Sequence, residues 1–253
     1  MTFMCRPVNK KTRLDRLVVE RGLAPSRERA RALILSGSVM VDDRVADKAG
    51  SLVFPDCDLR IKGGGNPYVS RGGLKLKGAL ETFGIEVDDM VVLDVGASTG
   101  GFTDCLLQEG ARRVYALDVG YGQIAWKLRV DERVVLIERT NIRRFDPSIL
   151  DDRIDLVTVD VSFISLKLVL PVLASFMGSG SRLLALIKPQ FEAGRTDVGK
   201  GGVVRDEAVR KRVVDGIVEY AGEIGFLVEG VCPSPLPGPA GNLEFFMYGQ
   251  RKP

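Results

Sequence analysis

A lysine stands at the end of an uninterrupted apolar stretch in the C-terminal half of the chain. Lys188 follows the residues L-L-A-L-I, so its side chain begins inside the expected core, where an ammonium group must be paired or lose its proton. A neutral lysine can accept the proton of a hydroxyl group, and a charged lysine can stabilise the alkoxide that forms. Lys188 therefore predicts chemistry on a hydroxyl group, with a solvent-reaching lysine at a strand end as the alternative.

Two more lysines lie where a helix is expected to begin, in the stretch S-R-G-G-L-K-L-K-G-A-L. The buried stripe of that helix is expected to contain Leu76, Ala79, Leu80 and Phe83. Lys75 and Lys77 flank the stripe about equally, each about 100° around the helix from the residue between them. Helical periodicity therefore does not decide which of the two lysines faces a site.

The chain of 253 residues contains no histidine, which removes Ser–His catalytic pairs, histidine bases and the commonest metal ligand. Its cysteines are far apart and form no C-x-x-C motif, which argues against a zinc site and a disulfide scaffold. They are Cys5, Cys57, Cys105 and Cys232. The sequence shows neither an apolar leader nor a run of about 20 apolar residues. We expect a cytoplasmic protein that uses no metal and no membrane.

The elements that position these residues follow from the pattern beyond residue 90. Short apolar runs that end in an acid or a glycine are typical of buried parallel strands. Here they cover residues 91–96, 113–119, 133–138, 155–161 and 183–188, and helices are expected at 103–109, 166–176 and 207–224. This alternation predicts an α/β fold with a doubly wound, Rossmann-like sheet that binds ligands at the C-terminal ends of its strands.

A glycine-rich turn follows the first of these runs, in L-D-V-G-A-S-T-G-G-F. It lacks the second glycine that admits a dinucleotide pyrophosphate, and no G-K-[ST] of a phosphate-binding loop follows. Asp118, about 20 residues later at the end of the next run, is placed to bind ribose hydroxyls. The form D-x-G-x-x-x-G-G resembles the S-adenosylmethionine loop of class I methyltransferases.

The resemblance of this turn implies a set of cofactor-binding residues. They are Asp94, Gly96, Ala97, Ser98, Gly100, Gly101, Asp118, Asn141 and Asp160. Two of them have a structural alternative, because Asp118 is suited to cap a helix and Asn141 to form a turn. A NAD-dependent oxidoreductase is a second interpretation, weakened by the glycine spacing.

The first 62 residues carry the basic excess of the chain, with 13 Lys/Arg against 8 Asp/Glu, whereas residues 63–253 carry 23 against 25. Two short helices, at 13–22 and 25–37, and then a hairpin are expected here. The stretch R-L-D-R-L-V-V-E-R-G-L-A-P-S-R-E-R-A-R-A-L-I-L-S-G-S-V-M-V-D-D resembles the S4-like RNA-binding domain, a small α+β unit. That resemblance implies phosphate contacts, with a solvated helix face as the alternative. The arginines concerned are Arg13, Arg16, Arg27, Arg29 and Arg31.

Two segments end expected strands where a substrate should lie, D-V-S-F-I-S from Asp160 and I-K-P-Q-F-E from Ile187. Methyltransferases that act on base or glutamine amines typically show N-P-P-Y or D-P-P-Y at the first place, and both prolines are missing here. Carbon-5 cytosine enzymes need a cysteine nucleophile, usually as Pro-Cys, whereas Cys232 precedes its proline. Neither kind of base methylation is therefore expected.

Eight longer stretches carry a resemblance that covers nearly the whole chain. They are S-R-G-G-L-K-L, L-D-V-G-A-S-T-G-G-F-T, D-V-G-Y-G-Q-I-A-W, E-R-T-N, D-V-S-F-I-S, I-K-P-Q-F-E, V-G-K-G-G-V-V and L-P-G-P-A-G-N-L-E-F-F. Together they are similar to the TlyA family of ribosomal-RNA ribose methyltransferases, which joins an FtsJ/RrmJ-type catalytic domain to an S4-like domain. The Lys-Asp-Lys-Glu tetrad of FtsJ-like enzymes falls on Lys75, Asp160, Lys188 and Glu244 without a departure, which selects Lys75 over Lys77.

The resemblance implies S-adenosylmethionine-dependent methylation of a ribose 2′-hydroxyl, of cytidine, in ribosomal RNA. It also implies an S4-like domain at 1–62 and a class I methyltransferase domain at 63–253, with a linker at 63–69. Lys188 would lie nearest the hydroxyl, while the two acids of the tetrad would hold the lysines and balance their charge. We expect a monomer or a weak dimer. Family members are also described as haemolysins, so a membrane-active protein is one alternative and a nonenzymatic rRNA-binding assembly factor is another.

Overall fold

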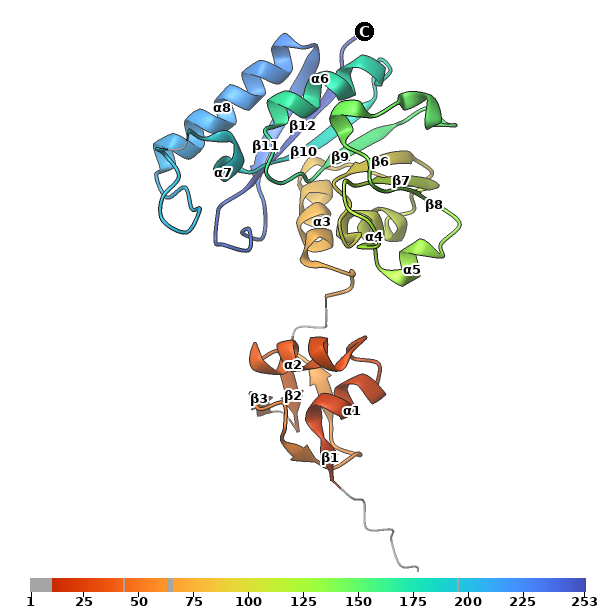
Figure 1. The fold of residues 1–253 in the computed structure, drawn as a ribbon, viewed down its shortest axis with the longest axis vertical. Coiled ribbons are helices and arrows are strands. Elements are labelled where there is room, and N and C mark those ends of the chain that lie inside the picture. Colours follow the sequence, from red (N-terminus) through yellow and green to blue (C-terminus); the bar gives the residue numbers. More distant parts are fainter. Residues whose placement is uncertain (1–10, 43, 63–65, 195) are drawn as a thin grey trace, which may run out of the picture. The chain divides into compact units, whose positions relative to one another are not determined.

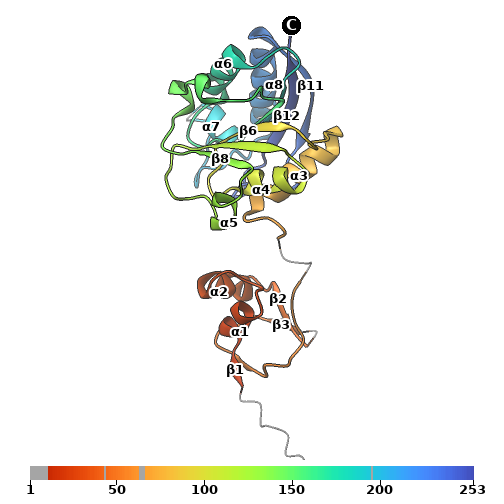
Figure 2. The same ribbon diagram turned by 90° about the vertical axis from the view of Figure 1, so that its right-hand side faces the viewer.

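The computed structural model describes residues 11–42, 44–62, 66–194 and 196–253. Cys5 and glycines 63–65 of the expected linker lie outside these residues. Contacts divide the chain into two compact units, Met1–Pro67 and Tyr68–Pro253, both drawn in Figures 1 and 2. Each unit has its own hydrophobic core.

In its described residues, the N-terminal unit contains two helices and small antiparallel sheets. Its elements are β1 (Thr12–Arg13), α1 (Leu14–Glu20), α2 (Arg27–Leu35), β2 (Val39–Val41), β3 (Arg44–Ala46), β4 (Leu52–Val53) and β5 (Leu59–Ile61). The Ser26 hydroxyl accepts a hydrogen bond from the amide of Arg29 and so caps the start of α2. The predicted helices and hairpin are confirmed, and β5 adds a third strand beside β2.

The C-terminal unit is built on a seven-stranded sheet in the order β11-β12-β10-β9-β6-β7-β8. The strands are β6 (Val91–Val95), β7 (Arg113–Leu117), β8 (Val134–Ile137), β9 (Leu156–Val159), β10 (Arg182–Ile187), β11 (Phe226–Pro233) and β12 (Phe245–Arg251). The five strands predicted from apolar runs are parallel to one another. The last two, β11 and β12, are antiparallel additions at one edge.

Helices cover both faces of this sheet, as Figures 1 and 2 show. On one face lie α3 (Arg71–Phe83), α4 (Gly101–Gln108) and α5 (Trp126–Arg129), and on the other lie α6 (Leu166–Phe176) and α8 (Glu207–Glu223). The short elements α7 (Pro189–Glu192), η1 (Ile142–Arg144) and η2 (Pro147–Ile149) lie in the connections. The predicted doubly wound α/β sheet is therefore confirmed.

The strand order also predicts where a ligand binds. From β6 the chain runs outward through β7 and β8, then returns to the other side of β6 with β9. The connections that leave β6 and β9 therefore diverge, which opens a crevice at the C-terminal ends of these two strands. Asp160 follows β9 directly, and the glycine-rich turn follows β6.

Candidate active site

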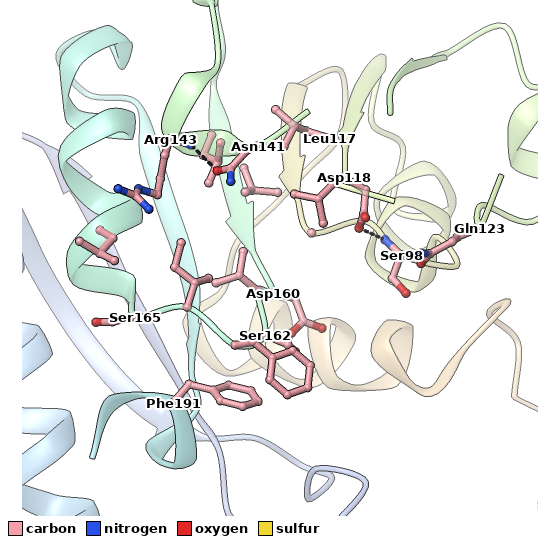
Figure 3. A pocket seen from close by; sticks show the side chains of 18 residues that line it. Ser98, Leu117, Asp118, Gln123, Asn141, Arg143, Asp160, Ser162, Ser165 and Phe191 are labelled. Atoms are coloured by element: carbon pink, nitrogen blue, oxygen red, sulfur yellow. Dashed lines mark hydrogen bonds between the residues drawn. The ribbon is translucent and has the colours of Figure 1, made fainter. Parts of the chain in front are cut away.

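A pocket of about 920 Å³ lies at the predicted crevice. Five of the expected cofactor-binding residues line it, and Figure 3 shows several of them. They are Gly96, Ser98, Asp118, Asn141 and Asp160. Ala97, Gly100 and Gly101 belong to the same turn but do not line the pocket, and neither does Asp94.

The turn after β6 packs closely against neighbouring segments at two of its glycines. Gly96 has φ 88°, and a Cβ atom there would meet the backbone carbonyl of Asp160. Gly100 has φ 93°, and a Cβ atom there would meet the side chain of Leu128 in α5. These positions need glycine because they combine the left-handed backbone region with close packing.

Asp118 holds the turn rather than a helix end. Its Oδ2 accepts a hydrogen bond of 2.8 Å from the Ser98 amide, and its Oδ1 accepts one of 2.6 Å from the Gly120 amide; Figure 3 shows the first of these. Asn141 lines the pocket and also caps η1, because its Oδ1 accepts from the Arg143 amide at 3.0 Å. Asn141 therefore lines the pocket and also forms a turn, so the two alternatives from the sequence do not exclude each other.

Asp94 lies inside the molecule, with no exposed surface. Its carboxylate accepts hydrogen bonds from the hydroxyls of Thr103 in α4, at 2.7 Å, and Thr158 in β9, at 2.9 Å. Asp94 therefore ties the first turn of α4 to β9. Burial raises the pKa of Asp94 to about 7, although both hydroxyl bonds lower it.

This buried acid predicts a pH dependence of stability. Between pH 4 and 7 the folded chain keeps the Asp94 proton that the unfolded chain releases, so the free energy of unfolding should fall by a few kcal/mol across that range. Above pH 7 the group is ionised in both states and its contribution stays constant. Urea denaturation of the wild type and of Asp94→Asn at pH 5 and 8 tests this. Equal pH slopes for the two proteins would refute it.

Two lysine–acid pairs lie at the strand ends. Lys188, directly after β10, pairs with Asp160 after β9 at 2.5 Å, and its ammonium also donates to the hydroxyl of Ser162 at 3.0 Å. Lys75 of α3 pairs with Glu244, just before β12, at 2.6 Å. The structure thus pairs all four predicted catalytic residues, although Lys75 and Glu244 are 169 positions apart.

The two pairs differ in their access to solvent. The side chains of Lys75 and Glu244 are 9% and 1% exposed, whereas those of Lys188 and Asp160 are 11% and 23% exposed. Asp160 also lines the pocket. Lys188 is therefore the lysine beside the pocket, and the Lys75–Glu244 pair is the better shielded one.

Lys77 has a different environment. Its ammonium pairs with Glu109 at 2.9 Å and with Glu81 at 3.4 Å, one turn along α3. The hydrogen bond to Glu109 raises the pKa of Lys77 above its usual value. Lys77 is thus an ion-paired, partly exposed residue.

Sequence reasoning missed three side chains near these pairs. Gln190 of α7 donates from Nε2 to Glu244 at 3.3 Å. Phe163 is 90% exposed with φ 63°, and its ring lies 4.9 Å from that of Phe191, both lining the pocket. All three occur in the quoted motifs D-V-S-F-I-S and I-K-P-Q-F-E, but nothing in their residue types separates them from ordinary core or turn residues.

The five arginines predicted to bind RNA are not equivalent. Arg13 and Arg27 both donate to the buried carboxylate of Asp15, at 3.0 and 2.9 Å, and the bond from Arg13 keeps the pKa of Asp15 well below its usual range. Arg16 pairs with Glu20. Within the described ranges, the guanidinium groups of the remaining two have no partner. These are Arg29 and Arg31 of α2.

Two further observations concern metals and membranes. Among the described residues, no three Cys, Asp or Glu side chains group in a way that suits a metal ion. No helix in the described ranges combines the length and apolar character that crossing a bilayer requires. Cys57, Cys105 and Cys232 are free and buried.

The sheet order, the glycine turn and the pocket define a class I methyltransferase fold. A solved S-adenosylmethionine-dependent methyltransferase from Mesorhizobium loti shares this fold, with a TM-score of 0.51 at 14% identity over 70% of this chain and 98% of its own. The model of the FtsJ-like methyltransferase matches residues 68–251, and that of the S4 domain matches residues 12–55. The chain belongs to the FtsJ-like methyltransferase family, which decides against the NAD-dependent oxidoreductase.

Relatives cover nearly the whole chain. The 16S/23S rRNA (cytidine-2′-O)-methyltransferase TlyA of Mycobacterium tuberculosis is 48% identical over 94% of this chain and 90% of its own length. Hemolysin A of Brachyspira hyodysenteriae is 42% identical over 93% of this chain and 98% of its own. The predicted similarity to the TlyA family is confirmed.

Proposed function

We propose that this protein transfers a methyl group from S-adenosylmethionine to the 2′-hydroxyl of a cytidine ribose in ribosomal RNA. One observation carries the proposal: four side chains from distant parts of the sequence form the pairs Lys188–Asp160 and Lys75–Glu244, and Asp160 lines the pocket. A relative with 48% identity carries this activity in its name. The protein would act in the cytoplasm as a monomer or weak dimer.

The pocket suits the proposed cofactor. The glycine turn allows a ligand to approach the backbone, and Asp118 at the end of the second strand is the acid that ribose hydroxyls require. Asn141 lines the same pocket and would contact the adenine, and the Gly96 backbone lies beside Asp160. When bound, S-adenosylmethionine would supply an electrophilic methyl group on a sulfonium.

The pair Lys188–Asp160 would act on the nucleophile. Lys188 would hold the 2′-oxygen and either take its proton or stabilise the negative charge that develops. Asp160 would keep the lysine in place, and Lys75 with Glu244 would form the second, shielded wall of the site. Because methyl transfer is a direct displacement, alignment of the attacking oxygen supplies much of the rate.

Phe163 suits the base of the target nucleotide. Its ring is almost fully exposed, follows Asp160 by three residues and packs against Phe191. An exposed aromatic ring beside a ribose site offers a stacking surface to a base that has left its helix. Stacking would hold the nucleotide while its 2′-hydroxyl reaches Lys188.

We also propose a division of labour, with residues 1–62 binding RNA and residues 63–253 carrying out catalysis. Replacing both Arg29 and Arg31 by alanine should weaken RNA binding about tenfold at moderate salt and reduce the salt slope by about 2, since each loses a phosphate contact. Filter binding to ribosomal RNA at several salt concentrations tests this. Arg16→Ala is the matched control, because its pairing with Glu20 leaves it less available. An equal loss from the control would contradict the assignment.

Labelled S-adenosylmethionine tests the reaction. Purified small and large ribosomal subunits that lack the modification are incubated separately with the enzyme, and the RNA is digested to nucleosides. We expect label on 2′-O-methylcytidine from at least one subunit. Label on a base, or no label with either subunit, would refute the proposed function.

A further inference from the structure

We propose that Ser162 is a positioning residue for Lys188, a role that rests on the ribose methylation proposed above. Its Oγ accepts a hydrogen bond of 3.0 Å from the Lys188 ammonium, the same nitrogen that pairs with Asp160 at 2.5 Å. Ser162 lies outside the Lys-Asp-Lys-Glu tetrad, and a serine in a strand-end loop carries no sequence signal for such a role.

The geometry at the ammonium nitrogen carries this inference. A lysine ammonium has three hydrogen-bonding positions. Ser162 accepts a hydrogen bond at one of them, and Asp160 lies 2.5 Å from the nitrogen as its ion-pair partner; in the described part of the chain no other polar atom bonds to this nitrogen. The hydrogen bond to Ser162 and the ion pair with Asp160 together limit how the ammonium can rotate, and a further position remains available to a substrate oxygen. A neutral lysine held by the same two acceptors would direct its lone pair there.

Both acceptors belong to the pocket wall. Asp160 and Ser162 line the 920 Å³ pocket, and Figure 3 shows both side chains there. The Lys188 side chain itself is only 11% exposed. Ser162 is exposed, so its hydrogen bond with the Lys188 ammonium lies where a substrate hydroxyl can reach the same nitrogen.

The residue after Ser162 has an unusual backbone conformation. Phe163 has φ 63°, a left-handed conformation that costs a residue with a side chain about 1–2 kcal/mol. Such conformations persist where the surroundings hold them, and they cluster at functional sites. Here the contact between Phe163 and Phe191 stabilises the turn that follows Ser162.

The test compares Ser162→Ala, Ser162→Thr and the wild type in single-turnover methylation of the subunit that the wild type modifies. Ser162→Ala removes the hydrogen bond that orients the Lys188 ammonium. This variant should react about tenfold more slowly, since a hydrogen bond to a charged group is lost. Its KM for the subunit and its Kd for S-adenosylmethionine should stay within about twofold of wild type. Ser162→Thr keeps the hydroxyl and should restore most of the rate.

Ser175→Ala is the matched control, because this serine is exposed on α6 and its hydroxyl bonds only to the Val172 carbonyl. A wild-type rate for Ser162→Ala would overturn the inference, as would a threonine variant as slow as the alanine variant. Weaker cofactor binding with an unchanged single-turnover rate would also overturn it and indicate a structural role. If the wild type itself methylates no ribose, the proposed function fails instead.

Discussion

Alanine in place of Lys188 should lower the rate of methyl transfer by about a thousandfold, the usual range for loss of a general base or an oriented cation. The lost ammonium is the group that bonds both Asp160 and Ser162 beside the pocket. Affinity for S-adenosylmethionine should change little, because the glycine turn and Asp118 are untouched. Single-turnover methylation measures the first effect and calorimetry the second.

A second variant distinguishes the two roles of this lysine. Lys188→Arg keeps a positive charge but cannot release its proton. If Lys188 acts as an oriented cation, the arginine variant should recover part of the rate, whereas a base role predicts no recovery. Thermal unfolding of each variant checks that the fold is intact. Methyl transfer by Lys188→Ala at the wild-type rate would contradict the assignment.

The two lysines of α3 should respond very differently to the same substitution. Lys75→Met leaves the buried Glu244 without its cation, so we expect methylation to be lost and the free energy of unfolding to fall by about 3–5 kcal/mol. Lys77→Met removes pairs with two partly exposed acids, which should cost about 1 kcal/mol or less and leave methylation near wild type. Urea denaturation and single-turnover methylation measure the two effects.

A double variant separates the loss of stability from the loss of function. Combining Lys75→Met with Glu244→Gln removes both charges, so much of the lost stability should return because no unpaired buried charge remains. Methylation should stay absent if the pair serves catalysis. Loss of methylation in Lys77→Met, with Lys75→Met active, would move the assignment to the other lysine.

Local patterns were enough for most of the fold. The apolar runs at 91–96 and 183–188 became β6 and β10, and the stretch 166–176 became α6. The antiparallel strand β12 was not predicted, because antiparallel pairing with β10 leaves no distinct local pattern in the sequence. Strand direction depends on the connection between the strands, which periodicity does not report.

Side-chain environments were harder to predict than elements. Asp94 has the residue type and position of a ligand contact, but two threonine hydroxyls from different elements enclose it. Asp118 lines the pocket while both its oxygens already accept backbone hydrogen bonds. The sequence shows where a residue lies along a strand. Its hydrogen-bond partners, however, belong to segments that are distant in the sequence.

The sequence by itself determined the alternation of strands and helices, the glycine turn after the first strand and the absence of histidine that leaves hydroxyl chemistry to lysine. These are local or compositional properties, so they can be read along one chain. Only the tertiary structure decided that Lys75 meets Glu244, that Lys77 meets Glu109, and that Ser162 shares the Lys188 ammonium with Asp160. The physical reason is that α3 packs its apolar face against the sheet. The direction of that face, together with the order of the strands, determines which polar groups come within bonding distance.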